Sequence, residues 1–126
     1  MHTTPAEDVA VAFNDAINAG SIGGLERLMT DDHRFVDSAG RAIEGKPACL
    51  AAWRGFFTSF PDYRNHFEDI GTHDELVVIR GHSRCETPEL DGPALWSARV
   101  LNALVSEWRV YDDTPANRRA LGITGS

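Results

Sequence analysis

The sequence predicts an α+β fold in which a cone-shaped, strongly curved antiparallel sheet packs on three helices. Helical periodicity marks the first half of the chain, β-branched and alternating segments mark the second half, and a tight link joins the last two segments. With 126 residues, 42% of them hydrophobic and 25% charged, the composition is that of an ordinary globular protein. We therefore expect a single domain over residues 1–126.

The first two elements are expected to be helices. The first begins near Thr4-Pro5 and ends at Gly20, because a hydroxyl residue before proline starts helices and glycine ends them. Its apolar residues recur at helical spacing: Val9, Ala10, Phe13, Ala16 and Ile17. A shorter helix should follow through Met29, and the polar residues 30–32 should break it.

A short strand at Phe35-Val36 and a third helix are expected next. Lys46-Pro47 suits the first turn of a helix, and Phe60-Pro61-Asp62 should end it, because proline disrupts a helix interior. Between these limits lies an aromatic-rich segment that includes Trp53, Phe56 and Phe57. This helix should contribute much of the apolar interior.

The second half of the chain should form antiparallel strands. Residues 63–71 alternate loosely, and Leu76–Ile79 is rich in β-branched residues. Residues 94–101 and 104–111 flank the tight link Asn102-Ala103, which is typical of a hairpin. A tail over residues 114–123, with one helical turn, should close the chain.

Charge and composition restrict the partners. The chain carries 12 basic against 19 acidic residues, a net charge of −7, which argues against nucleic acid or an anionic membrane surface. No apolar run approaches the ~18 residues of a membrane span, and no apolar leader follows the first Met, so a soluble cytoplasmic protein is expected.

The two cysteines, Cys49 and Cys85, are expected to be reduced thiols. The histidines lack the spacing of metal ligands, so we expect neither a metal nor a cofactor.

Four stretches resemble the nuclear-transport-factor-2-like superfamily, which includes ketosteroid isomerase and the SnoaL-like polyketide cyclases. They are FNDAINAGSIGGLERLMTDD, FVDSAGRAIEG, FFTSFPDYRNHFED and LVSEWRVYDDTPANRRALGI. The resemblance implies a cystatin-like α+β barrel with a conical cavity for an apolar small molecule, and a homodimer formed through the outer face of the sheet. The superfamily contains isomerases, cyclases, epoxide hydrolases and non-catalytic binding modules, so the fold does not determine the function.

Asp37 is the first candidate for catalysis. The resemblance to ketosteroid isomerase places it at the position of the general base, at the end of the first strand. The sequence Asp-Ser-Ala-Gly is also typical of a turn in which the aspartate accepts a backbone N–H. Phe35 and Asp37 share one side of the strand, however, so a carboxylate beside that cavity wall would be desolvated and its pKa raised. We expect the cavity orientation.

The last strand offers two alternatives. Glu107, Arg109 and Tyr111 share one face, and Trp108 and Val110 share the other. The isomerase pattern implies that the first set lines the cavity, with Arg109 and Tyr111 stabilising a substrate oxygen and Glu107 contributing to substrate binding. Alternatively, Trp108 and Val110 face the core, and Glu107 and Arg109 form an exposed pair.

Aromatic residues are the candidates for the substrate walls, although such residues more often form plain core. These candidates are Phe13, Phe35, Trp53, Phe57 and Trp96. His82 is expected on the outer face with Arg80 and Arg84, because Ile79 and Gly81 make the apolar face of that strand.

Two functions remain open. The isomerase-like oxyanion donors are missing, because the first-helix position is Phe13 and the strand position falls near Trp96 or Ser97. The first hypothesis is a cofactor-free isomerase, cyclase or lyase that acts on an apolar carbonyl compound through Asp37. The second is a non-catalytic ligand-binding or dimeric module. Outward-facing Arg109 and Tyr111, with Trp108 inside the cone, would favour the second.

Overall fold

The structure is a computed structural model that describes residues 5–123. It confirms the α+β class: over the described residues, four helices accompany a curved, open six-stranded sheet. In chain order the elements are α1 (Ala6–Ala19), α2 (Ile22–Leu28), β1 (Met29–Val36), β2 (Ala42–Glu44), α3 (Lys46–Ser59), β3 (Arg64–His73), β4 (Leu76–Arg84), the 3-10 turn η1 (Pro88–Leu90), β5 (Gly92–Leu101), β6 (Leu104–Asp112) and α4 (Pro115–Leu121).

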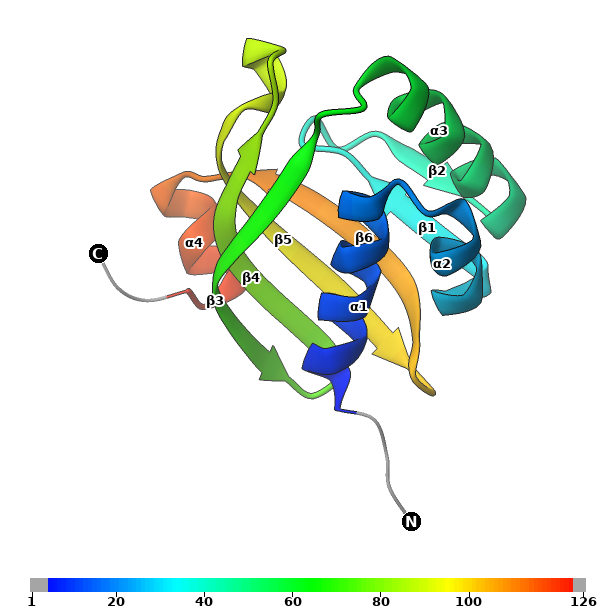
Figure 1. Ribbon diagram of the computed structural model, residues 1–126. Coiled ribbons are helices and arrows are strands. Elements are labelled where there is room, and N and C mark those ends of the chain that lie inside the picture. Colours follow the sequence, from blue (N-terminus) through cyan, green and yellow to red (C-terminus); the bar gives the residue numbers. More distant parts are fainter. Residues whose placement is uncertain (1–4, 124–126) are drawn as a thin grey trace.

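The strands follow the spatial order β2-β1-β6-β5-β4-β3. Strands β3 to β6 form an antiparallel meander, whereas β1 runs parallel to β6 and antiparallel to β2. Figure 1 shows α1 crossing one face of the curved sheet, α3 beside β1 and β2, and α4 on the opposite side. The interior therefore lies between the sheet and the helices α1 and α3.

Helix α1 packs against the sheet through its apolar stripe. Phe13 and Ile17 are fully buried, and the Phe13 ring stacks on Trp108 of β6 with 4.7 Å between ring centroids. The helix ends at Gly20, which takes the left-handed conformation with φ 63°. The backbone N–H of Gly20 donates to the carbonyl groups of Ala16 and Ile17. Thr4, the expected start of this helix, lies outside the described residues.

Three features of the secondary structure differ from the expectations: the start of β1, the presence of β2 and the length of α4. Helix α2 does end before residues 30–32, but these residues belong to β1, because β1 pairs with β6 from Met29 onward, with an irregularity before Arg34. Strand β2 was missed because it is only three residues long. Helix α4 is longer than one turn: the Thr114 hydroxyl accepts from the N–H of Asn117, and Gly122 closes the other end.

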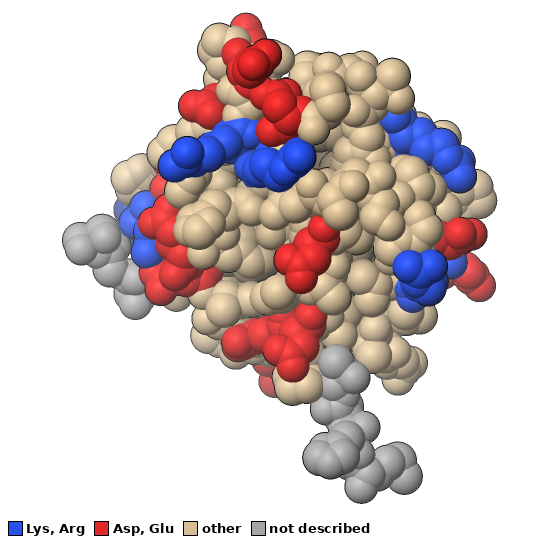
Figure 2. Space-filling model, in the orientation of Figure 1, with Lys and Arg blue, Asp and Glu red and all other residues tan. Residues whose placement is uncertain are grey.

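The surface charge is mixed. On the face that Figure 2 shows, small groups of acidic and basic side chains are scattered over a mainly uncharged surface, and some of them adjoin; no continuous basic area is seen. Among the described helices, none is long and apolar enough to cross a membrane.

A candidate ligand cavity in the cone

A cavity of about 320 Å³ remains between α3, the β1–β2 turn and strands β3, β5 and β6. Its walls are mainly aromatic and aliphatic: Phe35, Ile43, Trp53, Phe56, Trp96, Trp108 and Val110. The chain has three tryptophans, and all of them contribute to this lining. The side chains therefore leave the cone partly hollow, which is the geometry of a site for a small, largely apolar molecule.

Asp37 lies in the cavity lining and also closes the β1–β2 turn. Its Oδ1 accepts the backbone N–H groups of Ala39 and Arg41, both at 2.9 Å, and its Oδ2 accepts from Nε of Arg41 at 3.0 Å. The side chain is 31% exposed. Both alternatives considered for Asp37 therefore hold at once, because the turn occurs at the edge of the cavity.

The expectation of a raised pKa for Asp37 is wrong. The hydrogen bond from the backbone N–H of Arg41 lowers the pKa of this carboxyl below its ordinary value, and the Ala39 N–H and the Arg41 guanidinium act in the same direction. Partial exposure leaves too little desolvation to reverse the sign. Asp37 is therefore a carboxylate at neutral pH, and a weaker base than a desolvated aspartate would be.

Of the two alternatives for the last strand, the one that places Arg109, Tyr111 and Glu107 in the cavity lining is wrong. Trp108 and Val110 face inward, and strand alternation turns the other three outward. On the outer face the Arg109 guanidinium lies 4.9 Å from the centroid of the Tyr111 ring, and the Tyr111 hydroxyl lies 2.9 Å from Oγ of Ser97. Glu107 makes a long ion pair with Arg34, at 3.8 Å.

The aromatic candidates divide between the cavity and the surrounding core. Phe35, Trp53 and Trp96 belong to the lining, and the rings of Phe35 and Trp53 meet edge to face with their centroids 5.6 Å apart. Phe13 is wholly buried behind Trp108, in the core and not at the cavity surface. Phe57 packs on Trp53 from outside the lining and lies near Gly20.

The buried polar groups of the cavity come from β3 and β4. The phenol oxygen of Tyr63 lies 3.1 Å from Oγ of Ser83, which donates to Oδ1 of Asn65 at 2.7 Å. Tyr63 and Asn65 both contribute to the cavity lining. Burial raises the pKa of Tyr63 above its ordinary value, so the phenol keeps its proton at neutral pH.

Helix α1 holds the start of β3 in place. The side chain of Asn18 accepts the backbone N–H of Asn65 at 2.8 Å and donates to the carbonyl of the same residue at 2.9 Å. Strand β3 lies at the edge of the sheet, so these two backbone groups of Asn65 have Asn18 as partner in place of a neighbouring strand. The side chain of Asn65 is directed toward Ser83.

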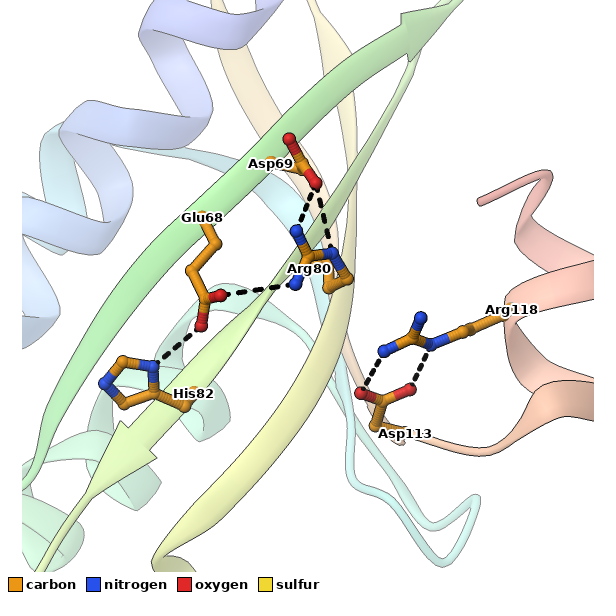
Figure 3. Close-up of polar contacts among 6 residues, drawn as sticks. All are labelled: Glu68, Asp69, Arg80, His82, Asp113 and Arg118. Atoms are coloured by element: carbon orange, nitrogen blue, oxygen red, sulfur yellow. Dashed lines mark hydrogen bonds and ion pairs between the residues drawn. The ribbon is translucent and has the colours of Figure 1, made fainter. Parts of the chain in front are cut away.

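Among the histidines of residues 5–123, none belongs to the cavity lining. His82 lies on the outer face of β4, as expected, where its Nδ1 is 2.9 Å from a carboxylate oxygen of Glu68 (Figure 3). Arg80 joins the same group through Glu68 and Asp69. His33 is fully buried against the carbonyl of Val105, and burial lowers its pKa. Within residues 5–123, no cluster of His, Cys, Asp or Glu could hold a metal ion.

Both thiols are free, as expected from the sequence. Cys49 is buried in the cavity wall, where burial raises its pKa, whereas Cys85 is partly exposed near Asp62.

A family model, the SnoaL-like domain, matches residues 10–114. The chain belongs to the SnoaL-like family. The match includes α3, the meander and the turn at Asp37, which are the elements that enclose the cavity. Among curated proteins, none matches this SnoaL-like domain significantly by sequence.

Solved structures share the fold of this SnoaL-like domain at low sequence identity. A candidate SnoaL-like polyketide cyclase from Shewanella putrefaciens CN-32 is 20% identical, with a TM-score of 0.75, 96% of this chain and 88% of that chain being covered. An LEH-like epoxide hydrolase from M. tuberculosis is 16% identical, with the same TM-score of 0.75 and with coverages of 92% and 88%. A cystatin-fold protein from Novosphingobium aromaticivorans is 19% identical, with a TM-score of 0.74 and coverages of 86% and 99%. At these identities the likeness shows the fold alone.

Proposed function

We propose that this SnoaL-like protein binds a small, largely apolar molecule inside the cone. One observation carries the proposal: a cavity of about 320 Å³, at the lower end of the roughly 300–1,000 Å³ typical of ligand pockets, is walled by all three tryptophans. Burying apolar surface of a ligand there would contribute about 25 cal/mol per Å². Neither lysine nor arginine belongs to the lining, which argues against an anionic ligand, because a buried negative charge would have no cation to pair with.

Thermal unfolding in the presence of tetralin, a bicyclic hydrocarbon, tests this proposal. The wild-type Tm should rise with tetralin concentration, because a ligand that binds only the folded state stabilises it. Val110→Phe should abolish the shift, because the new ring would occupy the cavity from the inner face of β6. Tyr111→Phe, the adjacent change on the outer face, should keep it. An equal response in all three proteins would place tetralin elsewhere and contradict the proposal.

A second candidate function is proton transfer by Asp37, without a cofactor, on an apolar carbonyl compound. It is favoured by the presence of an ionised carboxylate in the lining of an apolar cavity. In this reaction the carboxylate would take a proton from the carbon next to a carbonyl, leaving an enolate, and would return it to the same or another carbon. The hydrogen bonds from Ala39 and Arg41 that already engage the Asp37 carboxylate make it a weak base.

Hydrogen–deuterium exchange separates the two functions. With 1-tetralone in D₂O, an enzyme should speed the loss of the α-proton NMR signal, and Asp37→Asn should slow that loss by at least about tenfold. Asp62→Asn is a matched control, because Asp62 caps the backbone N–H of Glu86 and lies outside the cavity lining. Binding without exchange in the wild type would leave the non-catalytic function and exclude this proton transfer.

We also propose a homodimer that pairs the outer sheet faces. The outer group of Glu68, Asp69, Arg80 and His82 supplies charges of both signs, which could pair across a two-fold axis (Figure 3). Because such contacts are polar, the dimer should weaken as salt rises. Sedimentation velocity at low and high salt measures this, and a monomer at every protein concentration would contradict it.

A further inference from the structure

The link between β4 and β5, residues 85–91, contributes one apolar side chain to the cavity. Leu90 belongs to the lining, together with Asp37 and Ser38 of the β1–β2 turn. Ser38 is exposed and Leu90 is only partly buried, so the cavity reaches the surface where these two segments border it. Figure 1 shows the link extending beyond the ends of β4 and β5. The link therefore lies at the mouth of the cavity.

The link is a compact unit with its own hydrogen bonds. The 3-10 turn η1 within it is closed by two backbone hydrogen bonds, at 3.0 and 3.2 Å. The carboxylate of Asp91 accepts the backbone N–H of Cys85 at 3.0 Å, which joins the two ends of the link. The pairing of β4 with β5 stops at Ser83 and Gly92, just outside it. These contacts allow the link to move as one body about its two ends.

A single residue connects this unit to the rest of the protein by hydrogen bonds. Asp62, in the turn between α3 and β3, accepts the backbone N–H of Glu86 with Oδ2 at 2.7 Å, and its Oδ1 lies 3.6 Å from Sγ of Cys85. Within residues 5–123, no other hydrogen bond is found between the link and the remainder of the chain. A hydrogen bond to a charged carboxylate is stronger than one between neutral groups. Without Asp62 the link would be held only by its covalent ends and the packing of Leu90.

We propose that residues 85–91 form a lid over the mouth of the cavity, latched by Asp62, and that a ligand enters and leaves when this latch opens. Asp62 contacts the lid and lies outside the cavity lining, so the latch is the same in the free and the bound protein. Its strength should therefore set how fast a ligand exchanges and not how tightly it binds. The inference rests on the proposed ligand binding in the cone and adds the control of access to it.

Access to the empty cavity is tested with Cys49 as a reporter. Its thiol is buried in the cavity wall, so a small neutral reagent should reach it through an open mouth. Methyl methanethiosulfonate converts thiols to mixed disulfides, and mass spectrometry of peptides distinguishes Cys49 from Cys85. In Asp62→Ala, Cys49 should react about tenfold faster than in the wild type. This rate should stay nearly constant at low urea concentrations, because lid opening exposes far less surface than global unfolding.

Ligand exchange is tested with tetralin by stopped-flow quenching of tryptophan fluorescence. In Asp62→Ala, association and dissociation should both accelerate about tenfold, with Kd changed less than about twofold. Asp62→Asn keeps an oxygen that can accept the Glu86 N–H, so both rates should stay close to those of the wild type. Asp15→Ala removes an exposed carboxylate of α1 and should change neither rate. If Asp62→Ala does not fold, Leu90→Ala serves instead and should accelerate both Cys49 modification and tetralin dissociation.

The outcomes separate this inference from the proposed function. Equal Cys49 reactivity in the wild type, Asp62→Ala and Leu90→Ala would overturn the lid, even if tetralin binds. Faster Cys49 modification without any tetralin binding would support the lid and contradict the proposed function. Tetralin rates that are the same in Asp62→Ala and the wild type would overturn the control of access. An acceleration that Asp15→Ala shares would overturn the assignment to the Asp62 latch.

Discussion

Asp37 shows how one residue can satisfy two structural requirements. Strand alternation placed it on the same side as Phe35, and the structure has both residues in the cavity lining. Its pKa could not be predicted from that placement, because the sign depends on the Ala39 and Arg41 amides and on partial exposure. Those contacts come from the turn conformation, which a single sequence specifies only loosely.

Replacing Asp37 by Asn should therefore reveal a stabilising carboxylate. Because the folded pKa lies below the ordinary value of 3.8, the charged form contributes stability above that value and loses it as the pH falls through the folded pKa. The wild type should exceed Asp37→Asn by about 0.3–1 kcal/mol at pH 6, the modest size reflecting solvent screening. The difference should shrink toward pH 3.

Urea unfolding of both proteins from pH 3 to pH 7 measures this difference. A wild type that instead falls behind the variant as the pH rises would show a raised pKa, and would restore Asp37 as a desolvated base.

Gly81 is a position where the absence of a side chain is required. A Cβ at this residue of β4 would collide with the carbonyl oxygen of His66, where β3 approaches closely beside its bulge. Gly81→Ala should destabilise the protein by about 2–3 kcal/mol, because backbone must move to relieve the contact. Gly71→Ala in β3 meets nothing within 4 Å and should cost far less. Chemical denaturation measures both; equal losses would contradict the close approach.

Contacts between elements explain what holds the cavity open. Helix α1 fills one part of the cone with Phe13 and Ile17, while the aromatic residues of α3 enclose the remaining part. Helix α1 has a further connection to the sheet: its Asn18 side chain hydrogen-bonds the backbone N–H and carbonyl of Asn65 in β3, a contact called the Asn18 clamp below. That clamp fixes the point from which Tyr63 and Asn65 reach the cavity.

Removal of the clamp should loosen β3 at its start. Asn18→Ala leaves the backbone N–H and carbonyl of Asn65 without these partners, so we expect a loss of about 1–2 kcal/mol in the free energy of unfolding. Amide hydrogen exchange at Asn65 should accelerate with it. Asp15→Ala, an exposed change on the same helix, should alter stability by less than about 0.5 kcal/mol. Unchanged exchange at Asn65 in Asn18→Ala would show that the clamp is dispensable.

The sequence predicted the types of most elements because their periodicity is strong and their ends carry glycine or proline. It missed β2 and the true start of β1, because pairing with β6 and β1 overrides the polar character of those residues. The polar cluster of Tyr63, Asn65 and Ser83 was missed for a related reason. Tyr63, just before β3, and Asn65 in it lie two residues apart on one side of the chain, which the pattern could have indicated, but Ser83 joins them only through the register of β3 and β4.

At the scale of the whole molecule, the two faces of the sheet have different roles. The inner face holds the cavity, the tryptophans and the cluster of Tyr63, Asn65 and Ser83, whereas the outer face holds ion pairs and the helix α4 (Figure 3). Leu121 of α4 packs with Val78 and Leu95, and Arg118 bonds Asp113 at 2.6 Å. Which face Glu107, Arg109 and Tyr111 occupy depends on which side α1 and α3 cover, and alternation alone leaves both sides equivalent.

The most direct test of a ligand site inside the cone is a titration of isotopically labelled protein with tetralin, followed by ¹H–¹⁵N NMR. The three tryptophans give three indole N–H signals, one from each wall residue Trp53, Trp96 and Trp108. All three should shift together with a single dissociation constant, while the amides of Leu95 and Leu121 near α4 should stay in place. Indole signals that do not move, or shifts confined to the outer face, would contradict the site.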